Sequence, residues 1–143
     1  MYLLDSNTLR AYLKGHQTVI AHTLRVPSEE IALPSIVAAE ALRGRCEYVL
    51  KATADQVELA DKLLQETLRT LQSFQFVTFD PASVTALNHL LKQYRSRKRH
   101  ADVMIAALAL AGHHIVVTRN TKDFADLLPA LQLQNWIDDP PVN

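Results

Sequence analysis

The stretch DVMIAALALAGHHIVVT, residues 102–118, joins an apolar helix to an apolar strand and decides the fold class. Every residue from 103 to 111 is apolar, and Gly112 is a typical helix end. Because such a helix offers no polar face to solvent, we expect it to be buried. Residues 114–118 then predict a strand, and a nearly continuous apolar strand is typical of a parallel sheet covered on both faces.

Further strands and helices alternate on either side of this unit. Apolar runs predict other strands at residues 2–4, 30–33, 76–79 and 131–136. Helical patterns lie between them, and residues 55–73 form the clearest amphipathic helix. Alternation of this kind is typical of βαβ units. We therefore expect an α/β fold, with a single domain over residues 1–143 and three layers (α/β/α) around a central parallel sheet of four to five strands.

Composition narrows the possible functions. The 143 residues carry a formal net charge of zero, so affinity for nucleic acid or a membrane surface must come from a local patch. The single cysteine, Cys46, excludes an intrachain disulfide and suits a reducing cytosol. No apolar stretch is long enough to span a bilayer. We expect a soluble cytoplasmic protein.

Several acidic and amide residues lie close to the ends of the predicted strands. Asp5 comes just after the first strand, and Asn120 and Asp123 come after strand 114–118. Asp102 begins the buried helix that leads into that strand. Because the carboxyl ends of parallel strands form the edge where functional residues collect, these positions are candidates for a site.

Each of these residues also has a structural interpretation. Asp5 is as well placed to cap a helix as to do chemistry. Asp102 is a helix-start acid of the kind that the helix dipole favours. Asn120 and Asp123 have the spacing of a capping box.

Glu40 is harder to explain structurally. It is the only acid in the apolar stretch SIVAAEAL, residues 35–42. It could pair with Arg43 or point to solvent at a helix edge. An unpaired buried carboxylate is costly, so Glu40 also favours a functional site.

Taken together, the four acids favour a metal site. If they converge, each pair repels by roughly 4 kcal/mol at about 4 Å and an effective dielectric of about 20. Protons or a cation must then neutralise the cluster. Oxygen ligands without a histidine or cysteine partner favour a hard divalent ion, Mg²⁺ or Mn²⁺. Such a site can generate hydroxide and clamp a phosphodiester, as in nucleases.

Four sequence motifs resemble, in order and spacing, the conserved blocks of a known family. They are YLLDSN (residues 2–7), PSIVAAEALRG (34–44), HADVMIAALAL (100–110) and VVTRNTKDF (116–124). The family is that of the PIN-domain ribonucleases, and the short chain looks like the VapC-type toxins of bacterial toxin–antitoxin pairs.

The resemblance implies a Mg²⁺-dependent endoribonuclease, with Mn²⁺ as a possible substitute, in which metal-activated water attacks RNA. Asp5 and Asp102 would be the principal metal ligands, and Glu40 would complete the metal sphere directly or through water. The fourth acid of the family falls either where Asn120 stands or where Asp123 stands. Because Asn120 is an amide, we assign Asp123 as the fourth catalytic and metal-binding residue.

The resemblance also implies supporting residues and partners. Ser6 stands where many members have threonine, and it would place a hydroxyl near the metal. We assign supporting polar roles to Asn120 and Thr118 as well. The family implies a homodimer, and inhibition by a small antitoxin that inserts a segment into the active-site groove. DNA would be reached only through the antitoxin.

A basic run lies directly upstream of Asp102. It consists of Arg95, Arg97, Lys98 and Arg99. It could be a solvated helix end whose cations complement the dipole. It could equally contact RNA phosphates beside the acidic site, which a chain of zero net charge would need.

Two other functions remain open from the sequence. Asp5 after the first strand also suits an aspartyl phosphotransfer domain, but such domains need a lysine at a later strand end, where Thr118 and Arg119 stand. The chain could also be a non-catalytic interaction protein held in an antitoxin complex whose partner binds DNA. The complete set of four acids argues against that function.

Overall fold

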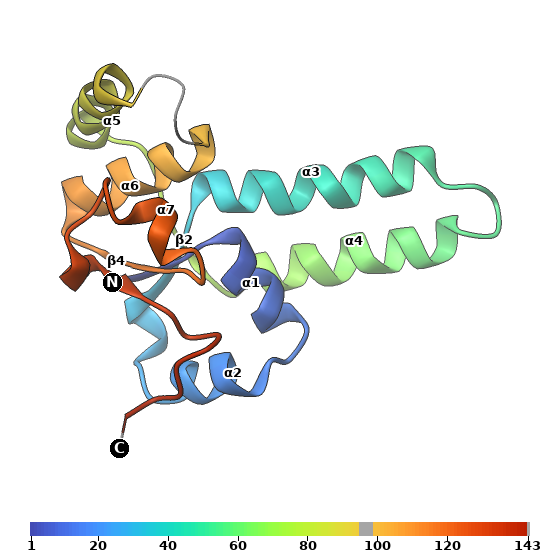
Figure 1. Cartoon of the computed structure of the whole chain (residues 1–143). Helices are drawn as coiled ribbons and strands as arrows, with labels where there is room; N and C mark the ends of the chain where they lie inside the picture. Colours follow the sequence, from blue (N-terminus) through green and yellow to red (C-terminus); the bar gives the residue numbers. More distant parts are fainter. Residues whose placement is uncertain (95–98, 143) are drawn as a thin grey trace.

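A computed structural model describes residues 1–94 and 99–142, and in that part of the chain it contains a five-stranded sheet (Figure 1). The strands are β1 (Tyr2–Leu4), β2 (Ile31–Pro34), β3 (Gln75–Val77), β4 (Ile115–Val117) and β5 (Leu133–Gln134). All neighbouring strands pair in parallel, in the order β3-β2-β1-β4-β5. The predicted parallel sheet is confirmed, with strand ends shifted by one or two residues.

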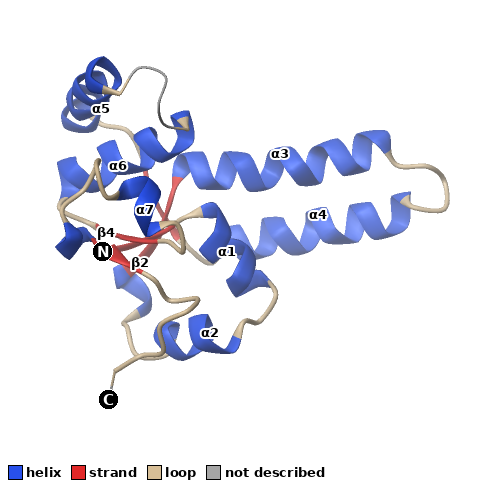
Figure 2. Cartoon of the chain, in the orientation of Figure 1, coloured by secondary structure: helices blue, strands red, loops and turns tan. Residues whose placement is uncertain are grey.

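Helices cover both faces of this sheet. They are α1 (Ser6–Leu13), α2 (Gln17–Thr23), α3 (Ser35–Lys51), α4 (Val57–Gln72), α5 (Pro81–Gln93), α6 (His100–Gly112) and α7 (Thr121–Phe124), with 3-10 turns at Ser28–Glu30 and Ala130–Gln132. Figure 2 shows α5 and α6 on one side of the strands and α1 and α2 on the other, which gives the expected three layers. Helices α3 and α4 pack together as a long hairpin that extends away from the sheet.

The core forms where α6 packs near the middle of the sheet. The side chains of Val103 and of residues 105–109 are buried, which confirms the buried helix expected from its all-round apolar sequence. Leu3 and Val116, on adjacent strands, have no exposed surface. Helix α6 begins at His100, two residues before the predicted start, so Asp102 lies within its first turn and does not cap it.

The strand order brings distant parts of the chain to one edge. The sheet runs from β1 to β2 on one side and to β4 on the other, so a crevice is expected at the carboxyl end of β1. The backbone N–H of Asp5 extends this ladder by donating to the carbonyl of Val117 at 3.1 Å. Segments after β1, β2 and β4 therefore meet there.

Candidate functional site

Asp5 is a buried helix cap at the end of β1. The residue is 5% exposed, and its Oδ1 accepts a hydrogen bond from the backbone N–H of Thr8 at 2.7 Å. This bond satisfies one of the free N–H groups at the start of α1. The capping interpretation is therefore confirmed, and the carboxylate sits at the crevice edge as well.

Glu40 contacts the start of α1. Its Oε2 accepts a hydrogen bond from the Ser6 hydroxyl at 2.7 Å, across 34 residues of sequence. Its Oε1 lies 3.9 Å from Nη2 of Arg99, and the Glu40 side chain is 20% exposed. Of the two structural alternatives for Glu40, the pair with Arg43 does not form: the Arg43 side chain is exposed, and Ser6 and Arg99 contact Glu40 instead. Ser6 thus links the Glu40 carboxylate to the residue that follows Asp5.

Asp102 lies in the electrostatic field of the other three acids. Burial raises the pKa of its carboxyl, and the charge of Arg99 lowers it. The negative charges of Asp123, Asp5 and Glu40 each raise it further. Acids from three other elements therefore lie near enough for their charges to reach the Asp102 carboxylate.

Asn120 and Asp123 differ in their surroundings. Asn120 precedes α7, and its backbone N–H donates to Oγ1 of the buried Thr118 at 2.9 Å. Its side chain makes no capping hydrogen bond, so the capping-box interpretation is wrong. Asp123 is exposed within α7, yet its charge is the strongest acidic contribution to the pKa of Asp102.

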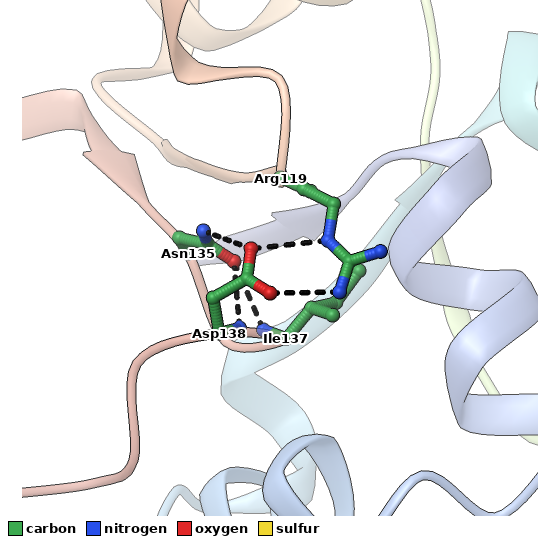
Figure 3. A network of polar contacts seen from close by, with 4 residues as sticks. All are labelled: Arg119, Asn135, Ile137 and Asp138. Atoms are coloured by element: carbon green, nitrogen blue, oxygen red, sulfur yellow. Dashed lines mark hydrogen bonds and ion pairs between the residues drawn. The ribbon is translucent and has the colours of Figure 1, made fainter.

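The loop between β4 and α7 is tied to the C-terminal segment. Arg119 donates two hydrogen bonds to Asp138, from Nε at 3.0 Å and from Nη2 at 2.7 Å (Figure 3). Asn135 Nδ2 donates to the same carboxylate at 2.8 Å, while Asn135 Oδ1 accepts from the backbone N–H groups of Ile137 and Asp138. The Arg119 side chain lowers the pKa of Asp138. This bidentate pair fixes the loop that carries Asn120, and no sequence pattern indicated it.

A groove of about 620 Å³ opens beside Glu40 and is lined by functional candidates that the sequence analysis missed. Ser6, Glu40 and Arg99 line it together with four further cations, which are Arg10, Lys14, Arg43 and Arg45. These cations come from α1 and α3 and are scattered along the sequence, so they formed no basic run. Of the predicted basic run, Arg95, Arg97 and Lys98 lie outside the described residues, while Arg99 is exposed and contacts Glu40.

The donor set suits a hard divalent ion. All four acids offer carboxylate oxygens, and Ser6 adds a hydroxyl next to Glu40. The pKa of Asp102 is raised first by burial and then by the negative charge of the three other acids, and a cation would offset that negative charge. Among the described residues, no three His, Cys, Asp or Glu side chains are already arranged as a metal site. The residues therefore fit a metal by chemistry, and ion binding requires them to draw closer together.

The described helices give no indication of a membrane span, because none of them is both long and apolar enough to cross a bilayer.

Comparison with solved structures finds similar folds. A DNA-bound VapBC from Salmonella typhimurium matches with a TM-score of 0.74 and 19% identity, over 94% of this chain and 97% of that chain. VapBC2 from Rickettsia felis, bound to a promoter DNA fragment, matches with a TM-score of 0.70 and 25% identity, over 94% and 98%. A toxin–antitoxin complex from Klebsiella pneumoniae matches with a TM-score of 0.70 and 21% identity, over 95% and 98%.

Comparison of sequences gives the family. No curated protein sequence matches the chain. The family model described as "PIN domain" matches residues 2–127. This range includes Asp5, Glu40, Asp102 and Asp123 as well as strands β1 to β4. The chain therefore belongs to the PIN domain family.

Proposed function

We propose that this protein is a divalent-metal-dependent endoribonuclease, with Mg²⁺ as the natural ion and Mn²⁺ as a substitute. The observation that carries the proposal is that Asp5, Glu40 and Asp123, on three separate elements, all lie close enough to Asp102 for their charges to act on its carboxyl at the carboxyl edge of the sheet. Membership of the PIN domain family and the adjoining cationic groove support it. A cluster of like charge lowers the stability of the fold, so its presence favours a ligand that offsets the repulsion.

In this proposal the four acids have different roles in binding the ion. Asp5 and Asp102 hold it directly, and Asp123 supplies the fourth carboxylate. Glu40 completes the sphere directly or through water, oriented by its 2.7 Å hydrogen bond from Ser6. When bound, the ion would activate water and neutralise charge on the scissile phosphate.

Other side chains support the site without holding the ion. Thr118 accepts the Asn120 backbone N–H and so fixes the loop beside Asp123. Asp5 keeps one oxygen in the cap of α1, which orients its carboxylate rigidly toward the crevice. Arg99 faces Glu40 from the start of α6 and contributes positive charge where a phosphate would approach.

The proposal includes a biological role as the toxin of a type II toxin–antitoxin pair. Its support is that the similar solved structures are described as VapBC or toxin–antitoxin complexes, some of them bound to DNA. We propose a cognate antitoxin as partner, a homodimer as the assembly, DNA contact only through the antitoxin, and the cytoplasm as the location. Co-expression with the neighbouring reading frame, followed by mass measurement of the complex, tests the partner and the stoichiometry.

The decisive experiment is RNA cleavage by purified protein with Mg²⁺ or Mn²⁺. We expect Asp5→Asn and Glu40→Gln to lower the rate at least about 100-fold. Asp61→Asn, an exposed acid on α4 outside the cluster, is the matched control and should cleave like wild type. Activity that persists in excess EDTA, or in both site variants, would refute the metal-dependent mechanism. Absence of cleavage by the wild type would favour the non-catalytic interaction protein.

A second pair of variants assigns the fourth acid. If Asp123 holds the ion, Asp123→Asn should weaken ion binding and cleavage together. The double variant Asp123→Asn with Asn120→Asp moves the carboxylate from position 123 to position 120. Its cleavage activity shows whether a carboxylate at position 120 can also hold the ion. Full activity of Asp123→Asn alone would remove Asp123 from the metal set.

A further inference from the structure

The groove beside Glu40 is strongly cationic although the chain as a whole is neutral. Among the described side chains that line it, five are cationic and one, Glu40, is acidic. The cations are Arg10 and Lys14 at the end of α1, Arg43 and Arg45 in the middle of α3, and Arg99 before α6. Helices α1 and α3 pack against each other (Figure 1), and the five cations line one groove.

Most of this charge is not neutralised by the protein. Within the described part of the chain, Arg10, Lys14 and Arg43 have no carboxylate partner. Arg45 donates from Nε to Oγ1 of Thr67 on α4 at 3.2 Å, and a hydroxyl partner positions the guanidinium without cancelling its charge. Arg119 is different, because its bidentate pair with Asp138 neutralises it.

Gly44 is a second, independent sign of a binding groove. It lies in the middle of α3, where glycine costs about 1 kcal/mol relative to alanine. A Cβ added there would meet nothing within 4 Å, so close packing within the protein does not require the glycine. Gly44 also lines the groove, and a side chain at this position would narrow it.

Two of the groove cations, Arg10 and Lys14, also line a second cavity beside α1. This cavity of about 470 Å³ also contacts Asn7. Asn7 adjoins Ser6, whose hydroxyl binds the Glu40 carboxylate. An extended ligand that follows these two cations therefore runs along the wall of the candidate active site.

We propose that Arg10, Lys14, Arg43 and Arg45 form a track that binds the phosphate backbone of single-stranded RNA and leads it to the acid cluster. The inference rests on the proposed nuclease function and names the residues that position its substrate. The observations favour RNA because a phosphodiester beside four carboxylates needs cations for its neighbouring phosphates, and zero net charge means that a local track must supply them.

The experiment measures RNA binding separately from cleavage. The parent is Asp102→Asn in EDTA, which we expect to bind RNA without cutting it, and the probe is a labelled single-stranded RNA of mixed sequence. Each lost phosphate contact should lower the slope of log K against log salt by about 0.7, so Arg10→Gln with Lys14→Gln should lower it by about 1.4. Affinity at about 50 mM salt should fall roughly 10- to 100-fold. Arg43→Gln with Arg45→Gln should act similarly.

Two controls separate the track from general charge and from folding. Lys62→Gln with Lys92→Gln removes the same charge from exposed positions outside the groove and should change the slope little. Gly44→Leu fills the groove without changing charge, so it should weaken binding while the slope stays the same. Thermal melting of the lysine and arginine variants should stay within about 2 °C of the parent, because the substituted cations lie at the surface, and Gly44→Leu should melt no lower than the parent because it removes a glycine from a helix interior.

The outcomes distinguish the track from the nuclease function. Unchanged slopes in both groove variants, with wild-type cleavage of RNA intact, would overturn the track and leave the nuclease proposal standing. If the groove variants lower the slope of log K against log salt but the wild type never cleaves RNA, the track is supported and the proposed nuclease function is overturned. Poly-glutamate serves as a second probe, which mimics an acidic protein segment. Groove variants that keep the RNA affinity of the parent but lose binding to poly-glutamate would assign the groove to an acidic protein segment, and this would also overturn the proposal.

Discussion

Asp102→Asn should stabilise the metal-free fold while it removes cleavage. In the folded protein burial disfavours the charged form of Asp102, the charge of Arg99 favours it, and the charges of Asp123, Asp5 and Glu40 disfavour it. A carboxylate in such surroundings loses on the order of 1 to 2 kcal/mol relative to its neutral form when the groups are only partly buried. Solvent screening of partly exposed groups reduces the combined effect to about 1 kcal/mol. For a chain of 143 residues this raises Tm by about 3 °C.

The stabilisation should depend on pH with a definite sign. The pKa of Asp102 in the folded state lies above its ordinary value of 3.8, so the folded state binds this proton more tightly than the unfolded state. The charged carboxylate therefore destabilises the fold fully above the folded-state pKa and not at all below 3.8. The gain from Asp102→Asn is complete at pH 7 and fades as the pH falls toward 4.

Thermal melts in EDTA at pH 7 and pH 4 test this reasoning. Asp61→Asn is the matched control, because Asp61 is exposed on α4 and contributes no shift to Asp102. Addition of Mg²⁺ should then raise the Tm of wild type and leave Asp102→Asn unchanged, since only the wild type keeps the full ligand set. An Asp102→Asn variant that melts at or below wild type at pH 7, or whose gain is equal at both pH values, would refute the electrostatic argument.

Two further predictions concern neighbouring contacts. Ser6→Ala should weaken Mn²⁺ binding and lower the cleavage rate about 10-fold, because Glu40 loses its 2.7 Å hydrogen bond. Ser6→Thr keeps the hydroxyl and should retain activity. Mn²⁺ titrations that show an equal loss of affinity in both variants would contradict this role of Ser6. Gly112→Ala should cost about 1 to 3 kcal/mol because its Cβ would lie 2.1 Å from Nε2 of His114, whereas Gly44→Ala should gain about 1 kcal/mol. Urea unfolding of the two alanine variants measures both changes in the free energy of unfolding. Changes of the same sign would show that contacts of the added Cβ do not govern the stability at these two glycines.

The sequence by itself determined the layered fold and the positions of the acids. The all-apolar stretch 103–111 required burial, and short apolar runs between helical patterns required a covered parallel sheet. The all-apolar stretch and the alternation of strands with helices can both be read from neighbouring residues alone, without knowledge of distant contacts. Asp5 and Asp102 were identifiable as candidates because strand ends in a parallel sheet share one edge. Pattern could not separate capping from chemistry at Asp5, which caps α1 and also faces the acid cluster.

Only the tertiary structure decided which side chains meet. Glu40 has Arg43 one turn along its own helix, yet it binds Ser6 and approaches Arg99, because the packing of α1, α3 and α6 sets those distances. The groove cations are dispersed on α1 and α3 and became a track only when the two helices packed together. The bond between Arg119 and Asp138 likewise depends on where the C-terminal segment crosses the loop after β4. Such contacts are set by the relative placement of whole elements, which local sequence pattern does not encode.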